Sequence, residues 1–145
     1  MIQHNEMQTT FLSLAENESF ARVVTAAFAL QLSPTLSEIA DIKTAVSEAV
    51  TNAIVHGYEG TLGVVTLRAS IRGHMLTLEV EDTGKGIPNV AQAMEPFYTT
   101  HPEQERSGMG FAVMQTFMDD VEVHSTPGKG TLVRMRKRLP AACMA

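Results

Sequence analysis

The strongest constraint on the fold is a set of segments in which apolar and polar residues alternate. Residues 63–71 and 75–82 follow this period of two, and the break between them contains Gly73. Such alternation is typical of strands with one buried face, and a short glycine-containing break indicates an antiparallel hairpin. A turn rich in proline and glycine joins a second alternating pair, residues 120–125 and 130–138. The chain is therefore expected to build a mostly antiparallel sheet.

Two helices are expected before the first hairpin. Apolar residues recur at helical spacing within residues 17–32. After a Ser-Pro break, Thr35 and Glu38 form a capping-box pattern, which predicts the start of a second helix that runs to about His56. Gly57 follows directly and is well suited to end that helix.

The remaining segments complete a prediction of one α+β domain over residues 1–145. Residues 8–14 are expected to form a short first strand, and a third helix is expected at about 108–118. Residues 83–107 are polar, glycine-rich and too long for an ordinary connection, which indicates a functional loop. We therefore expect a two-layer sandwich, with helices on one face of a mixed, mostly antiparallel sheet. The other sheet face would be solvated or covered by a partner.

Charge and composition argue against several functional classes. The net charge of −5 gives no broad basic surface for phosphates, so direct nucleic acid binding is not expected. No apolar run approaches the roughly 20 residues that cross a bilayer, and no signal peptide is predicted, so no membrane association is expected. A single cysteine, Cys143, permits no intrachain disulfide, which favours a cytoplasmic location. A short basic cluster is interpreted as the solvated face of a strand: Arg134, Arg136, Lys137 and Arg138.

A narrow polar stripe on the second predicted helix is the first candidate site. Glu48, Asn52 and His56 are spaced by four and share one helix face, while apolar residues cover much of the rest. An asparagine amide oxygen can contribute one neutral ligand to Mg²⁺, and a carboxylate one turn earlier can act as a base. By itself the pattern also fits an ordinary solvated helix face.

Asp82 is the second candidate. It continues the buried row of its strand, in phase with Leu78 and Val80, and Gly84 and Gly86 follow it in a turn. A carboxylate accepts hydrogen bonds, so it matches the exocyclic amino group of adenine. The alternative interpretation is a turn cap, because Asp commonly precedes Gly in Asx turns.

A third candidate, residues 106–111, lies just before the third predicted helix. Free backbone N–H groups and the positive end of the helix dipole would make an anion site there. The segment is not a dinucleotide fingerprint, because Val113 stands where the third glycine would be. Residues 128–131 do not form a phosphate-binding P-loop either, because glycine follows Lys129.

Taken in order, these segments resemble the motifs of the Bergerat-fold (GHKL) ATPase and kinase superfamily. Within it, the chain resembles the sporulation anti-sigma F factors over almost its whole length. The superfamily motifs are residues 48–52, 82–86, 95–100, 106–110 and 130–131, and the segments that resemble the anti-sigma F factors are residues 16–22, 47–54 and 105–111.

The resemblance implies three activities. The chain would form a homodimer that holds a sigma factor of the sigma-F type inactive. It would use Mg²⁺ and ATP to phosphorylate a serine of a small anti-anti-sigma protein, and binding of that protein would release the sigma factor. Arg22 matches a residue with which the family meets its protein partners.

The resemblance also implies roles for individual residues. Asn52 would hold Mg²⁺, Glu48 would accept the proton of the substrate serine, and Arg106 would reach the terminal phosphate. Asp82 would read the adenine of ATP or ADP. Residues 94–107 would form a lid over the phosphates. The remaining nucleotide contacts would come from Gly84, Gly86, Ile87, Thr99, Thr100, Ser107, Gly108, Met109, Gly110, Phe111 and Thr131.

The family pattern leaves one departure and several alternatives. The family commonly has Lys where this chain has His101, so more of the lid's phosphate charge would rest on Arg106. A general-stress anti-sigma kinase of the sigma-B type would share the ATP motifs. A nucleotide-gated binding module without significant kinase activity is a further alternative. A histidine kinase is disfavoured, because the sequence leaves no room before residue 17 for the helix pair that carries a phosphoacceptor histidine.

Overall fold

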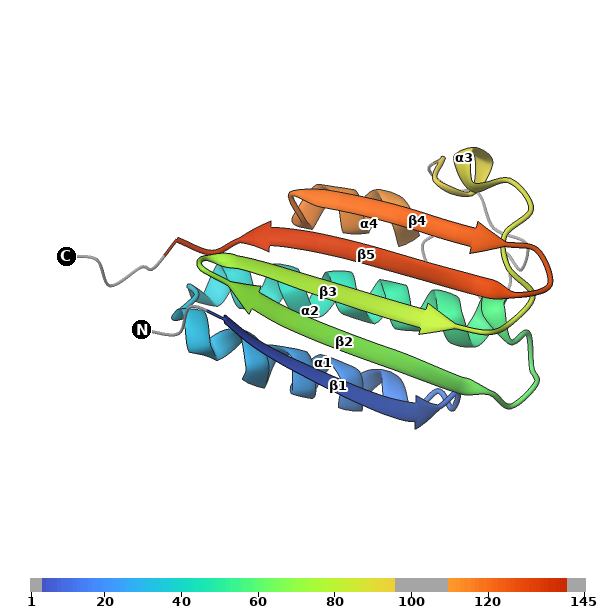
Figure 1. Cartoon of the computed structure of the whole chain (residues 1–145), viewed down its shortest axis with the longest axis horizontal. Helices are drawn as coiled ribbons and strands as arrows, with labels where there is room; N and C mark the ends of the chain where they lie inside the picture. The colour runs from blue at the N-terminus through green and yellow to red at the C-terminus, as the bar shows by residue number, and fades with distance from the viewer. Residues whose placement is uncertain (1–3, 96–109, 141–145) are drawn as a thin grey trace.

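A single five-stranded sheet forms one layer of the molecule (Figure 1). The computed structural model describes residues 4–95 and 110–140. The strands lie in the order β1-β2-β3-β5-β4, and every pairing between these strands is antiparallel. Both predicted hairpins are confirmed. The strands are β1 (His4–Leu12), β2 (Val64–Arg72), β3 (Met75–Asp82), β4 (Asp120–Thr126) and β5 (Gly130–Arg138).

The helices cover one face of this sheet, which confirms the predicted two-layer sandwich (Figure 1). The Thr35 side chain accepts a hydrogen bond from the Glu38 amide, and the Glu38 side chain accepts one from the Thr35 amide, so the capping box is formed. The helices are α1 (Asn17–Ala29), α2 (Leu36–Asn52), α3 (Val90–Ala93) and α4 (Gly110–Phe117). No helix within the described ranges is long and apolar enough to cross a membrane.

Three elements differ from the sequence-based expectation. The first strand begins at His4, because β1 pairs with the whole of β2 and reaches its last residue. The second helix ends at Gly57 as predicted, but its last turn, Ala53–Gly57, is π-helical. The loop after β3 contains the four-residue helix α3, which is too short to show periodicity and which the Asn89 side chain caps through the Gln92 amide.

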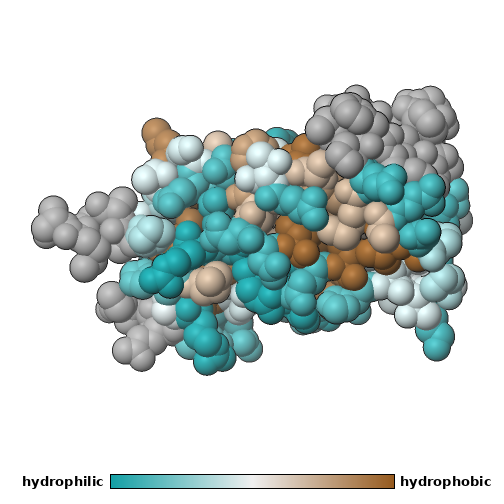
Figure 2. Space-filling model, turned by 90° about the horizontal axis from the view of Figure 1, so that it is seen from above, coloured by the Kyte–Doolittle hydropathy of each residue, from teal (hydrophilic) through white to brown (hydrophobic). Residues whose placement is uncertain are grey.

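The core lies between the sheet and the helices. Alternate residues of β2 and β3 are fully buried, and α2 contributes Ile42, Val46 and Val50 from the other layer. Each buried Val, Leu or Ile side chain among them contributes about 1.5–3 kcal/mol through burial. Seen from above, the surface is mostly hydrophilic, and hydrophobic atoms come to the surface in a band at its middle (Figure 2).

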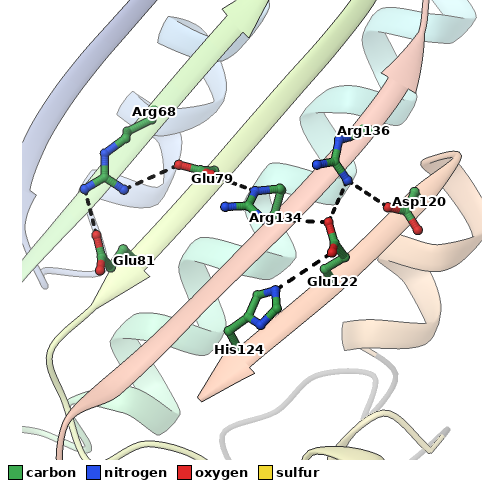
Figure 3. A network of polar contacts seen from close by, with 8 residues as sticks. All are labelled: Arg68, Glu79, Glu81, Asp120, Glu122, His124, Arg134 and Arg136. Carbon is green, nitrogen blue, oxygen red and sulfur yellow. Dashed lines mark hydrogen bonds and ion pairs between the residues drawn. The ribbon is translucent and has the colours of Figure 1, made fainter. Parts of the chain in front are cut away.

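Charged side chains of alternating sign cover the opposite face of the sheet (Figure 3). Arg68, Glu79, Arg134 and Glu122 stand directly opposite one another on successive strands. Arg134 Nε lies 2.7 Å from Glu79 Oε2, and Arg68 Nη1 lies 3.5 Å from Glu79 Oε1. Arg136 adds a contact of 2.6 Å to Glu122. The interpretation of the basic cluster as a strand face is therefore confirmed for Arg134 and Arg136. Each of them forms an ion pair with an acidic side chain on a neighbouring strand.

Lys137 departs from that interpretation. It follows Met135 on the helix side of β5, where its ammonium donates a hydrogen bond of 2.6 Å to the Phe117 carbonyl. Asp41 of α2 lies 3.8 Å away. Because the period of a strand is two, Lys137 faces away from its basic neighbours and ties β5 to the helix layer.

Replacement of Thr35 by Ala should destabilise the fold by about 1 kcal/mol, because it removes the side-chain acceptor that caps α2. Urea unfolding should show a lower midpoint with an unchanged slope. Thr44→Ala is the matched control, since Thr44 lies on the same helix and only donates to the Ala40 carbonyl. A loss in Thr44→Ala equal to that in Thr35→Ala would contradict the capping role.

Candidate functional site

A cavity of about 230 Å³ opens where the end of α2, the end of β3 and the start of α4 meet. The loop that follows β3, including α3, closes one side of it. Most of its wall is apolar, and a few polar groups converge on it, which is the usual composition of a small-molecule site. The lining residues most relevant to chemistry are Asn52, His56, Asp82, Lys85, Asn89 and Thr131.

Asp82 places a carboxylate in this wall. It is the last residue of β3, and only 6% of its surface is exposed. Burial raises the pKa of its carboxyl group, because the charged form loses water, while hydrogen bonds from the backbone N–H groups of Gly84 and Thr131 partly oppose the shift. The Gly84 amide lies 2.9 Å from Oδ1. The sequence prediction that Asp82 continues the core row is confirmed.

Two glycines allow the end of α2 to approach this carboxylate. A Cβ on Gly57 would lie 2.8 Å from the Asp82 carboxyl carbon, and a Cβ on Gly84 would lie 2.0 Å from the Gly57 carbonyl oxygen. That carbonyl accepts a hydrogen bond of 2.9 Å from the Lys85 amide. The π-helical turn thus ends in direct contact with the loop after β3, and neither glycine could carry a side chain in this arrangement.

The β4–β5 hairpin holds the other side of the loop. The Ile87 amide donates to Ser125 Oγ at 2.7 Å, and this oxygen lies 2.8 Å from Thr131 Oγ1. The Gly128 amide donates to the Lys85 carbonyl at 2.6 Å. Gly86 has φ of 77°, and a Cβ there would lie 2.4 Å from the Thr126 carbonyl oxygen. Hydrogen bonds therefore hold the loop after β3 between the π-helical turn and the β4–β5 hairpin, which are distant in sequence.

The polar stripe of α2 faces the start of α4. A Cβ on Gly110 would lie 3.3 Å from Asn52 Oδ1 and 3.4 Å from Glu48 Oε2. Glu48 and Asn52 therefore point to the same place, where the absence of a side chain at Gly110 leaves space. Asn52 lines the cavity together with Asp82, and Glu48 lies beside Asn52 at its edge.

The structure brings many of the predicted site residues together. Those that line the cavity are Asn52, Asp82, Gly86, Ile87, Gly110, Phe111 and Thr131. Gly84 is placed behind Asp82, against Gly57. Arg22 lies elsewhere, on α1, where its Nε is 2.9 Å from Glu18 Oε2. The predictions that fall outside the described residues concern Thr99, Thr100, Arg106, Ser107, Gly108 and Met109, and also His101.

Sequence reasoning did not single out several lining residues. Lys85, Pro88, Asn89, Gln92 and Glu95 lie in the loop that was predicted to be functional, but no spacing rule assigned them a position. Among these residues, Asn89 offered a signal for the start of a helix, because asparagine is a preferred N-cap, and here it caps α3.

The cavity residues fit a magnesium ion only if phosphate oxygens and waters supply most of its ligands. Within residues 4–95 and 110–140, no group of three or more His, Cys, Asp or Glu side chains could hold a metal. The Asn52 amide oxygen beside Gly110 can supply one neutral ligand. Mg²⁺ commonly takes one or two protein oxygens and completes its octahedron with phosphate oxygens and waters, so this donor set fits it.

Comparison with known proteins agrees with this geometry. The model of the histidine kinase-like ATPase domain family matches residues 11–137. An anti-sigma F factor from a Thermoanaerobacter species is 65% identical over 92% of this chain and 93% of its own length. The anti-sigma F factor of Clostridium acetobutylicum is 59% identical over 92% of this chain and 94% of its own, and that of Anoxybacillus flavithermus is 55% identical over 93% of each.

A solved structure supports the fold independently. The RsbU and RsbW domains of a Mycobacterium tuberculosis protein superpose with a TM-score of 0.68 at 20% sequence identity. The match covers 93% of this chain and 32% of that one. At this level of identity the likeness concerns the arrangement of the helices and the sheet.

Replacement of Asp82 by Asn should stabilise the protein at neutral pH. Because the pKa of Asp82 is raised above 3.8, the folded state keeps this proton while the unfolded state has lost it, so stability falls as pH rises through this window. The neutral amide removes that loss. Thermal unfolding at pH 3 to 8 should show the variant gaining relative to the parent above about pH 4. The control is Asp120→Asn on the charged sheet face, which should show no such gain; a less stable Asp82→Asn at pH 7 would contradict the argument.

Proposed function

The chain belongs to the anti-sigma F factor family and carries its histidine kinase-like ATPase domain, and from this premise we propose that it is a serine kinase as well as a sigma-factor inhibitor. It would bind a sigma factor of the sigma-F type and transfer phosphate from Mg-ATP to a serine of the anti-anti-sigma protein. The observation that carries the proposal is the single cavity that joins Asp82 of β3 to Asn52 of α2, with Glu48 at its edge.

Asp82 would recognise the adenine. Its Oδ1 already accepts the Gly84 amide, and the carboxylate can accept a further hydrogen bond from an exocyclic amino group in the cavity. The apolar wall offered by Val80, Val133 and Ile87 suits the faces of a planar base. Hypoxanthine has a carbonyl oxygen in place of the amino group, and this oxygen and the Asp82 carboxylate would both be acceptors. The site would therefore favour adenine over hypoxanthine.

Asn52 and the start of α4 would lie near the phosphates. The first amide N–H groups of a helix have no acceptor within the helix, and the helix dipole favours negative charge at that end, so the N-terminal side of α4 would suit phosphate oxygens. Asn52 would offer its amide oxygen to the metal. Mg²⁺, when bound, supplies positive charge to the phosphate oxygens and so stabilises the transferring group.

Glu48 would act as the base. The serine hydroxyl oxygen attacks the terminal phosphorus, the bond to the bridging oxygen breaks, and ADP leaves with that electron pair. The proton of the hydroxyl passes to the Glu48 carboxylate, which lies one helical turn from Asn52 and points to the same space beside Gly110. This placement supports the role that the family resemblance implies for Glu48.

Arg22 would contact the protein partners. Half exposed on α1, it forms an ion pair with Glu18, and the other oxygen of Glu18 accepts a hydrogen bond of 2.8 Å from Ser47 Oγ. Ser47 directly precedes Glu48. This chain of contacts supports a nucleotide-gated form of sigma binding, in which α2 senses the nucleotide and α1 meets the partner. The homodimer, the cytoplasmic location, and the choice of sigma-F over a sigma-B type partner stay predictions.

Glu48→Gln should abolish phosphoryl transfer while it preserves nucleotide binding. The loss of a general base lowers the rate by about a hundredfold or more. Transfer of label from the γ-phosphate of ATP to the anti-anti-sigma protein measures the rate, and calorimetry with ADP measures binding. Glu6→Gln, an exposed change on β1, is the matched control. Undiminished labelling of serine by Glu48→Gln would remove Glu48 from this role.

Arg22→Ala should weaken partner binding by about tenfold and leave the affinity for ADP unchanged, because Arg22 lies on α1 and does not line the cavity. Binding of the purified sigma factor should be measured with ATP, with ADP and without nucleotide. Arg72→Ala, an exposed arginine at the end of β2, is the control. Equal affinities in all three nucleotide conditions would rule out gating, and an unchanged affinity in Arg22→Ala would place the partner site elsewhere.

A further inference from the structure

Tyr58 has an unusual position at the point where β2 and β3 separate. It directly follows the π-helical turn, its amide donates to the Ala53 carbonyl at 3.1 Å, and only 7% of its surface is exposed. The ring fills the space beside Gly63, where an added Cβ would lie 2.2 Å from a ring carbon. The missing side chain at Gly63 thus leaves room for the ring, which carries its hydroxyl to a defined place.

The hydroxyl of Tyr58 bridges two backbone groups that would otherwise face each other. It accepts a hydrogen bond of 2.8 Å from the Thr83 amide and donates one of 2.5 Å to the Val64 carbonyl. The last paired residues of the β2–β3 ladder are Val65 and Asp82, so the next opposite positions are Val64 and Thr83. The phenol oxygen thus takes the place of the next direct bond between the strands.

This insertion has a geometric consequence for the cavity. A direct bond between backbone N–H and C=O groups spans about 2.9 Å, whereas a bridging oxygen holds the same two groups farther apart. The strands must separate there, immediately after Asp82. Thr83 is thereby fixed at a set distance from β2, and Gly84, whose amide donates to the Asp82 carboxylate, follows it directly.

We propose that Tyr58 is a positioning residue for base recognition. Its hydroxyl ends the β2–β3 ladder at Thr83 and so holds the Asp82 carboxylate where it can accept a hydrogen bond from the base. The inference rests on the proposed nucleotide-binding function and extends it to a residue that does not line the cavity. Because Tyr58 is not among the residues that line the cavity, its effect would reach a bound nucleotide through Thr83 and Asp82.

The test compares ADP with inosine diphosphate, which carries an oxygen in place of the adenine amino group. Tyr58→Phe keeps the ring and removes the hydroxyl. We expect its affinity for ADP to fall about tenfold, and the preference for ADP over inosine diphosphate to fall with it, because the loss falls on the amino-group contact. Isothermal titration of the full chain with each nucleotide gives both values.

Ser13→Ala is the matched control. Ser13 is also buried, and its hydroxyl also bridges two backbone groups, accepting from the Gly63 amide at 2.9 Å and donating to the Thr61 carbonyl at 3.3 Å. Its hydroxyl bonds are to Thr61 and Gly63, not to Thr83. We expect it to lower the unfolding temperature as Tyr58→Phe does, and to leave the ADP preference unchanged. An equal loss of preference in both variants would assign the effect to general loosening and overturn the inference.

A second measurement needs no substitution. Thr83 lies beyond the last residue of β3, yet its amide should exchange with solvent as slowly as the amides of the ladder, because the Tyr58 hydroxyl holds it. Fast exchange at Thr83 in the parent protein would overturn the inference even if Tyr58→Phe failed to fold. A parent protein that binds no ADP would contradict the proposed function itself, whereas ADP binding with an unchanged preference in Tyr58→Phe would contradict this inference alone.

Discussion

The buried carboxylate of Asp82 is the interaction around which the site is organised. A charged group at the end of a core strand loses its water, and this cost is tolerable only where neighbouring donors replace part of the hydration. Backbone amides of Gly84 and Thr131 do so, and Gly57 leaves room for the carboxylate itself by lacking a side chain. The end of α2, the loop after β3 and the β4–β5 hairpin all meet around this one acid.

The two faces of the sheet have different roles. On the helix side, alternate strand residues build the core and end in the cavity. On the other side, charged side chains of β2, β3, β5 and β4 neutralise one another in ion pairs. Each pair contributes little stability, because its side chains are partly exposed to solvent. One face of β3 and β5 therefore supplies a wall of the site, while the opposite face of the sheet presents a polar surface that does not compete with it.

Local patterns predicted the parts of the fold that local forces decide. Alternation located both hairpins, the pair Thr35 and Glu38 located the start of α2, and the phase of Asp82 with Leu78 predicted that its carboxylate would be buried. The π-helical turn and the partner of the Lys137 ammonium could not be read in this way. Both depend on contacts between segments distant in sequence, namely Gly57 with Lys85 and Lys137 with the carbonyl of Phe117. The roles expected for Thr99, Thr100, Arg106, Ser107, Gly108 and Met109 stay predictions, because these residues lie outside the described ranges.

The π-helical turn at the end of α2 also constrains which length changes the family can accept. Each residue added to or removed from a helix rotates everything beyond it by roughly 100°. A deletion between Glu48 and Gly57 would swing the Gly57 carbonyl away from Lys85 and turn the Asn52 face relative to Asp82. A few residues later the constraint disappears, because Gly60 has φ of 86° and open space around it. Evolutionary insertions should therefore gather at the turn around Gly60, while the helical segment before it keeps its length.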